Sequence, residues 1–128
     1  MKEPMKQHGA FSWFELVTPD VEAATSFHRK LFGWTTEKVP MGGMSYTVVK
    51  VGGEDVGGIM AMPPQAKGVP PHWGVYVTVD DADATAKLAV QMGAKIIVPP
   101  QDIPDVGRFC LFQDPQGAFL SVITYLRP

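Results

Sequence analysis

The chain has 128 residues, 45% hydrophobic and 19% charged, a composition typical of a folded domain rather than a disordered segment. Its net charge of −2 and the lack of a Lys/Arg cluster disfavour nucleic acid as a partner. The single cysteine, Cys110, excludes an internal disulfide and is typical of a reducing compartment. Because residues 1–10 lack the apolar core of a signal peptide and no run suits a membrane helix, we expect one cytoplasmic domain.

The first half of the chain predicts a strand, a helix and three further strands. Residues 11–17 are mostly apolar and predict the first strand, after which Thr18 or Asp20 can cap a helix. That helix ends at Gly33, which suits a left-handed C-cap. Its buried stripe is expected to hold Val21, Ala24, Phe27 or His28, and Leu31. Further strands are expected at 34–38, 45–51 and 56–62, with a turn at 40–43.

The second half repeats this order after a proline-rich linker at 63–72. A strand at 73–79 leads to a helix capped by Asp80 or Asp81. The buried stripe of this helix is expected to hold Thr85, Leu88, Ala89 and Met92. Strands are then expected at 94–98, 108–112 and 118–124, with an extended loop at 99–106.

The two halves therefore look like copies of one unit. The acidic turn, helix and terminating glycine between Asp20 and Gly33 reappear between Asp80 and Gly93. Two copies of this length make one domain, since a solenoid needs at least about three repeats. We predict an α+β fold in which paired βαβββ modules, at about 10–62 and 73–126, form a cupped mixed β-sheet with one helix backing each module.

Three motifs connect this pattern to a known family. They are Thr18-Pro19-Asp20 with the later Leu31-Phe32-Gly33-Trp34, the Val79-Asp80-Asp81 turn, and Asp114-Pro115-Gln116-Gly117 before the last strand. In this order they resemble the vicinal oxygen chelate superfamily of glyoxalase I, bleomycin-resistance and fosfomycin-resistance proteins and extradiol dioxygenases. Trp13-Phe14-Glu15-Leu16 and Val106-Gly107-Arg108-Phe109 resemble a glyoxalase-like or hydroxylase-like subgroup. The resemblance implies a homodimer, sometimes with modules exchanged between chains.

The resemblance also implies a divalent cation held by four side chains, usually His or Glu, on the concave sheet. The matching positions here are Trp13, Gly74, Ser121 and one residue within 58–60. Since none offers the imidazole or anionic donor that such an ion requires, we expect no metal and no cofactor. His72 and Glu15 remain a conceivable displaced pair, but two ligands make a poor site, and His72 also fits a solvated end of the linker.

Strand alternation indicates which side chains line the cup. Trp13, Glu15 and Val17 would face inward, whereas Phe14 and Leu16 would face the helix. An aromatic-lined cavity with few polar groups is typical of a small-molecule site. The candidate ligand-binding residues are Trp13, Glu15, Tyr46, Met60, Tyr76, Phe119 and Ser121.

Glu15 is the candidate catalytic residue, as a general acid or base. A carboxylate on an inward face costs free energy unless it is paired or hydrogen-bonded. Glu15 would therefore pair with Arg108, orient a ligand, or bond to Tyr or backbone groups as a structural carboxylate. Arg108 would otherwise meet an anionic ligand or lie in solvent, and Cys110 is expected to be an inert core thiol.

Three functions remain open at this stage. The first is a metal-independent module that binds or sequesters a small aromatic or apolar molecule, as in the bleomycin-resistance branch. The second is a metal-free enzyme with Glu15 as acid or base. The third is a metal-dependent lyase or oxygenase with displaced ligands. The fold alone does not separate them, because one scaffold hosts many chemistries.

Overall fold

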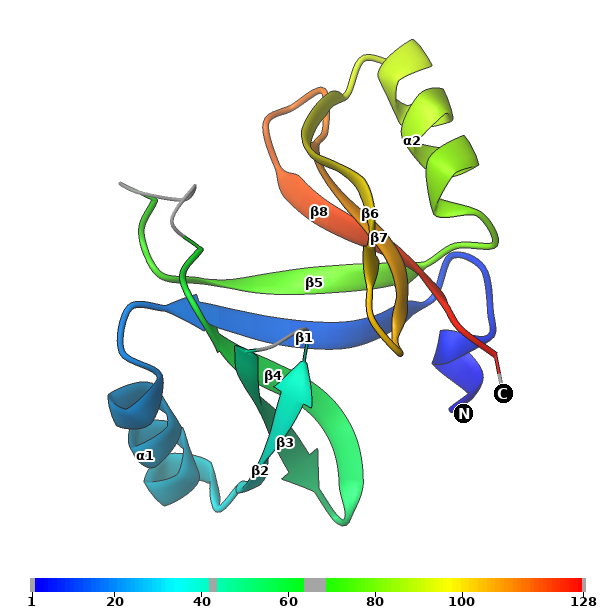
Figure 1. Cartoon of the computed structure of the whole chain (residues 1–128). Helices are drawn as coiled ribbons and strands as arrows, with labels where there is room; N and C mark the ends of the chain where they lie inside the picture. Colours follow the sequence, from blue (N-terminus) through cyan, green and yellow to red (C-terminus); the bar gives the residue numbers. More distant parts are fainter. Residues whose placement is uncertain (1, 42–43, 64–68, 128) are drawn as a thin grey trace. The chain divides into compact units, whose positions relative to one another are not determined.

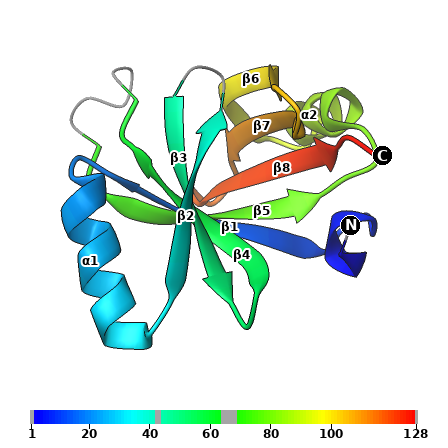
Figure 2. The ribbon, with the colours of Figure 1, turned by 60° about the horizontal axis from the view of Figure 1, so that its bottom comes forward.

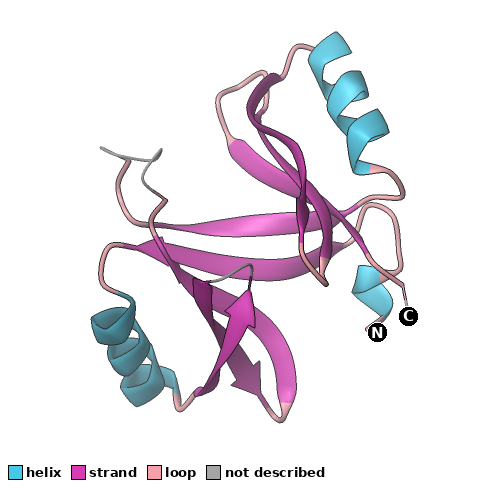
Figure 3. Ribbon diagram, in the orientation of Figure 1, coloured by secondary structure: helices cyan, strands magenta, loops and turns pink. Residues whose placement is uncertain are grey.

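A computed structural model describes residues 2–41, 44–63 and 69–127 (Figures 1 and 3). After a short 3₁₀ turn at Glu3–Met5, the βαβββ order occurs twice, and the predicted α+β fold of paired βαβββ modules is confirmed. The first copy contains β1 (Phe11–Thr18), α1 (Val21–Phe32), β2 (Thr35–Met41), β3 (Met44–Val51) and β4 (Glu54–Ala61). The second copy contains β5 (His72–Thr78), α2 (Ala82–Gln91), β6 (Lys95–Ile103), β7 (Gly107–Gln113) and β8 (Phe119–Tyr125).

The chain divides into two compact units, residues 13–74 and residues 1–12 with 75–128. The strand order is β2-β3-β4-β1 in the first copy and β5-β8-β7-β6 in the second. In each copy the first and last strands pair in parallel and the other pairs are antiparallel. Of the expected linker at 63–72 and turn at 40–43, residues 64–68 and 42–43 lie outside the described residues.

Helix α1 begins and ends where the sequence indicates. The Asp20 carboxylate accepts a hydrogen bond from the backbone N–H of Ala23 at 3.0 Å, and Gly33 takes a φ of 73° as the C-cap. Val21 and Ala24 pack against a core formed by Leu16, Val49 and Ile59. Of the expected stripe, His28 is half-buried, whereas Phe27 and Leu31 are exposed.

Helix α2 packs through smaller side chains than the sequence suggested. Asp81 caps it by accepting from the N–H of Ala84, and Ala82 and Ala86 are buried. These alanines lie four residues apart, so they share one face and allow a close approach to the core around Val79, Cys110 and Val122. The expected burial of Leu88 and Met92 was wrong, because their side chains are 55% and 71% exposed.

The expected loop at 99–106 is also corrected. Strand β6 continues through Pro99 and Pro100 to Ile103, with register shifts between Ile96 and Val98 and between Val98 and Gln101. Proline is tolerated at sheet edges and bulges, where its missing N–H breaks no ladder hydrogen bond. Because β6 is an edge strand in this order, the prolines interrupt its register without ending it.

Candidate ligand-binding site

Three of the predicted site residues form one hydrogen-bonded group in the unit of residues 13–74. The indole N–H of Trp13 donates to the Tyr46 hydroxyl oxygen at 3.0 Å. The Tyr46 hydroxyl donates in turn to Glu15 Oε2 at 2.6 Å, a distance typical of a hydroxyl bonded to a carboxylate. Tyr46 is buried, and Trp13 and Glu15 are half-buried. The inward carboxylate is thus bonded to a tyrosine, one of the alternatives that the sequence left open.

Gly58 makes this arrangement possible. Strand β4 lies between β3, which carries Tyr46, and β1, which carries Glu15, and Gly58 is the register partner of Glu15. A Cβ placed on Gly58 would overlap the ring and hydroxyl of Tyr46. The tyrosine therefore crosses β4 over a residue without a side chain. A glycine inside a strand often marks such a close approach. Gly58 was therefore the feature of the sequence that could have indicated the crossing of Tyr46.

The remaining residues of this face follow strand alternation. Val17 and Met60 are register partners two positions beyond Glu15 and Gly58, so both lie on the same face. Met60 is half-buried. The structure therefore brings Trp13, Glu15, Tyr46 and Met60 to one face of the first sheet.

The other predicted site residues lie in the second unit. Tyr76 and Ser121 are register partners on β5 and β8, and both are 8% exposed. The Tyr76 ring lies 6.3 Å from that of Phe109, centroid to centroid. Phe119 lies at the start of β8 and is 61% exposed. Tyr76 and Ser121 thus share a buried face with Phe109, whereas Phe119 lies at its margin.

The four positions that match the family's metal ligands do not fit a divalent cation. The indole N–H of Trp13 is a donor already bonded to Tyr46, and Gly74 offers no side chain. Within 58–60, Gly58 has no side chain, and Ile59 and Met60 offer no carboxylate or imidazole. Ser121 offers one buried neutral hydroxyl. Hard or borderline cations bind carboxylate, imidazole or thiolate donors. Within 2–41, 44–63 and 69–127, His, Cys, Asp and Glu form no group of three or more suited to a metal ion.

His72 lies at the start of β5 with an exposed side chain. Its Nδ1 is 2.9 Å from the carbonyl oxygen of Pro70, a contact within the local turn. This placement agrees with the solvated linker end expected from the sequence.

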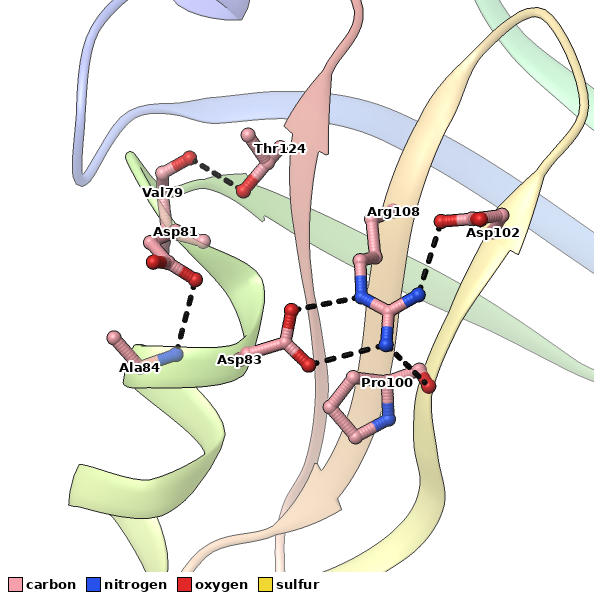
Figure 4. Close-up of polar contacts among 8 residues, drawn as sticks. All are labelled: Val79, Asp81, Asp83, Ala84, Pro100, Asp102, Arg108 and Thr124. Carbon is pink, nitrogen blue, oxygen red and sulfur yellow. Dashed lines mark hydrogen bonds and ion pairs between the residues drawn. The ribbon is translucent and has the colours of Figure 1, made fainter.

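Arg108 is held by carboxylates of its own unit (Figure 4). Its Nε and Nη2 donate to the two carboxylate oxygens of Asp83 at 2.8 and 3.1 Å, and its Nη1 donates to Asp102 at 3.0 Å. Nη2 also donates to the carbonyl oxygen of Pro100 at 3.3 Å. Arg108 therefore clips α2 to β6 and β7 at the surface, where its side chain is 39% exposed. This agrees with the expected surface arginine and adds two carboxylate partners that the sequence did not predict.

The charges of this clip stabilise each other. The hydrogen bond from Arg108 is the largest cause that lowers the pKa of Asp83 below its ordinary value. Asp83 and then Asp102 raise the pKa of Arg108. Cys110, by contrast, is fully buried, and burial raises the pKa of its thiol, as expected for an inert core cysteine. In the described part of the chain, no helix is long and apolar enough to cross a membrane.

The fold and motifs define a protein of the vicinal oxygen chelate class. Residues 10–122 match the model of the Glyoxalase/Bleomycin resistance protein/Dioxygenase superfamily, and the chain belongs to this superfamily. The resemblance drawn from the sequence motifs is thereby confirmed.

Two kinds of relatives match nearly the whole chain. Two proteins named provisionally as glyoxylase CFP32, from Mycobacterium bovis and Mycobacterium tuberculosis, are each 43% identical to this chain over 120 residues. The match covers 93% of this chain and 45% of each relative. The anthracycline biosynthesis protein DnrV of Streptomyces peucetius is 35% identical over 127 residues, 89% of this chain and 46% of its own. The chain thus spans less than half the length of these relatives.

Solved structures share the fold at low identity. Methylmalonyl-CoA epimerase from Mycobacterium tuberculosis superposes with a TM-score of 0.66 at 12% identity, covering 93% of this chain and 89% of its own. A variant of the Streptomyces coelicolor epimerase in complex with 2-nitronate-propionyl-CoA also has a TM-score of 0.66 at 12% identity, covering 94% of this chain and 100% of its own. Likeness at this identity establishes the fold alone.

Proposed function

We propose that this protein binds a small aromatic or apolar molecule, without a metal ion, on the face that carries Trp13, Tyr46 and Glu15. The observation that carries the proposal is the hydrogen-bonded group of these three residues. Two of its members, Trp13 and Glu15, lie on β1, and Trp13 matches a metal-ligand position of the family. The third, Tyr46, passes over Gly58, which lies within 58–60, the range of another metal-ligand position. An aromatic surface with one oriented carboxylate replaces the cation there.

The geometry suits stacking on a planar ligand. Because the indole N–H of Trp13 is bonded to Tyr46, the ring is oriented before a ligand arrives, which reduces the entropy lost on binding. Ring faces stack on planar molecules in offset or edge-to-face geometry. Glu15 would orient a polar group of the ligand. The name of the Streptomyces peucetius relative, an anthracycline biosynthesis protein, supports planar polycyclic molecules as the first probes. The lone cysteine supports a cytoplasmic location.

The test is a fluorescence titration with planar polycyclic compounds, beside metal analysis of freshly purified protein. We expect saturable quenching that is unchanged by a chelator. Trp13→Phe should raise the Kd by about two- to tenfold, because the smaller ring stacks less well and lacks the N–H that bonds to Tyr46, and one stacking contact contributes about 0.5–1.5 kcal/mol. Trp73→Phe is the matched control, since Trp73 packs against His28 and Trp34 on the helix side. Stoichiometric metal, or equal effects of the two substitutions, would overturn the proposal.

A metal-free enzyme is the second candidate, and the 2.6 Å hydrogen bond between Tyr46 and Glu15 favours it. A carboxylate held in place by a tyrosine hydroxyl suits proton transfer to or from a bound molecule. Glu15→Gln separates the two candidates. Unchanged binding with loss of turnover would support the enzyme. Absence of turnover by the unmodified protein across a broad substrate panel would support the binding module.

A further inference from the structure

The hydrogen bonds of the Trp13, Tyr46 and Glu15 group all run in one direction. The indole N–H of Trp13 donates to the Tyr46 hydroxyl oxygen at 3.0 Å, and the Tyr46 O–H donates to Glu15 Oε2 at 2.6 Å. An indole nitrogen can only donate hydrogen bonds, and an ionised carboxylate can only accept them. Both donor hydrogens are therefore used within the group, and its chain of hydrogen bonds ends on an acceptor.

Glu15 has the capacity to accept a hydrogen bond from a ligand as well. A carboxylate offers about four acceptor sites, more than the bond from Tyr46 uses. A hydrogen bond donated to a carboxylate also favours its charged form. Toward a ligand, the group therefore presents acceptor oxygens and a negative charge, and neither of its donors.

The other charges on this face of the first sheet also sum to a negative value. Lys50 lies four residues after Tyr46 on β3, so both side chains share the face. The Lys50 ammonium lies 2.6 Å from a carboxylate oxygen of Asp55 and 3.4 Å from one of Glu37. The hydrogen bond with Asp55 is the largest cause that raises the pKa of Lys50, so the ammonium stays charged beside these carboxylates. Among the described strand residues of the unit 13–74, alternation puts no other lysine or arginine on this face.

The other basic side chains that the structure describes in this unit lie on the helix side of the sheet. Lys38 points to the opposite face of β2 from Glu37, and its ammonium lies 2.6 Å from a carboxylate oxygen of Glu22 on α1. Arg29 and Lys30 lie in the last turn of α1, and this helix lies beside β2 (Figure 2). The charges of the unit are thus sorted, with the cations gathered on the helix side and an acidic face around Glu15.

We propose that the ligand of the face around Glu15 is a planar cation, an aromatic molecule that carries a protonated amine close to its rings. This inference rests on the proposed binding function and adds the chemical class of the ligand. The rings would stack on Trp13 while the ammonium donates to Glu15, which makes this carboxylate the residue that selects the charge of the ligand. A planar anion would bring acceptors to a group that offers neither of its donors, and a further negative charge to an acidic face.

Three anthracene derivatives test the charge of the ligand, because they share one ring system and differ in one substituent. The aminomethyl derivative is a cation at neutral pH, the hydroxymethyl derivative is neutral, and the carboxyl derivative is an anion. Each is titrated with the unmodified chain at constant ionic strength, and binding is measured by the fluorescence anisotropy of the anthracene. The Kd of the aminomethyl derivative should be about tenfold lower than that of the hydroxymethyl derivative, because hydrogen bonds between charged groups are the stronger ones. The Kd of the carboxyl derivative should be at least about tenfold higher than that of the hydroxymethyl derivative.

Glu15→Gln tests which residue selects the charge. The amide keeps the shape of the side chain and an oxygen that can accept from Tyr46, but it removes the charge. The Kd of the aminomethyl derivative should therefore rise by about tenfold, and that of the hydroxymethyl derivative should change by less than about twofold. Glu54→Gln is the matched control, because Glu54 is an exposed carboxylate that alternation puts on the opposite face of β4 from Asp55. This control should leave the order of the three derivatives unchanged.

The outcomes separate this inference from the proposed function on which it rests. If none of the three derivatives binds saturably, the proposed function fails, and the inference fails with it. If the three Kd values lie within about threefold of each other, or the carboxyl derivative binds most tightly, the binding function stands and the assigned charge is wrong. A preference for the aminomethyl derivative that survives Glu15→Gln, or that Glu54→Gln removes equally, would also overturn the inference.

Discussion

Gly58→Ala is the sharpest test of the hydrogen-bonded group. The added Cβ would overlap the ring and hydroxyl of Tyr46, which is only 6% exposed and has little room to move. Tyr46 must then leave its place above β4. This movement breaks the hydrogen bond from Trp13 and the hydrogen bond to Glu15.

The expected cost follows from these contacts. A hydrogen bond to a charged group contributes about 1.5–3 kcal/mol, and the half-buried Glu15 would recover part of that from water. Overpacking adds about 1 kcal/mol or more. We therefore expect Gly58→Ala to lower the free energy of unfolding by about 2–3 kcal/mol.

The assay is urea unfolding at neutral pH, with Gly74→Ala as the matched control. Among the described residues, the nearest atom that a Cβ on Gly74 would meet is the carbonyl oxygen of Glu15 at 3.8 Å, an ordinary contact. Gly74→Ala should therefore change stability by less than about 0.5 kcal/mol. In a Tyr46→Leu background, Gly58→Ala should also become nearly neutral. Equal costs for the two alanine variants, or full additivity in the double variant, would refute the reasoning.

Three further predictions concern the rest of the fold. Arg108→Gln should make the urea midpoint less sensitive to acid. Because Arg108 lowers the pKa of Asp83, their ion pair stabilises the folded protein above about pH 4, and this stabilisation is lost as the pH falls through the pKa of Asp83 in the folded state. A variant with the same acid profile as the unmodified chain would contradict this. Cys110 should react with thiol reagents at pH 8 only at the rate of unfolding, since it is 0% exposed and burial raises its pKa; fast labelling of the native protein would disprove it. Ile59→Ala, in the first core, should cost about 3 kcal/mol in urea unfolding, and a cost under about 1 kcal/mol would show that this core is loosely packed.

The local elements were predictable because their signals are short-range. Asp20 and Gly33 mark the ends of α1 through one capping carboxylate and one left-handed residue, both read from neighbouring positions. The repetition of this unit sixty positions later predicted the paired modules, and Thr18-Pro19-Asp20 with Asp114-Pro115-Gln116-Gly117 predicted the family. Strand alternation predicted that Trp13, Glu15 and Val17 share one face, and the register of β1 with β4 adds Met60 to it.

Contacts between strands were beyond the reach of the sequence. Tyr46 was expected near Glu15, but only the register of β4 shows that it crosses Gly58 to reach the carboxylate. Arg108 forms hydrogen bonds to Asp83 on α2 and Asp102 on β6, which lie 25 and 6 positions away in the sequence. The rotation of α2 likewise depends on how closely Ala82 and Ala86 approach the core, which exposes Leu88 and Met92.

The amino-acid order by itself determined the modules, the helix ends and the lack of cation-binding side chains at the family's positions, because each depends on residue type or on neighbours in the chain. The tertiary structure decided which polar groups bond to each other and which apolar side chains stay in solvent. Those outcomes depend on strand register and helix rotation, and both are set by packing between residues far apart in the chain.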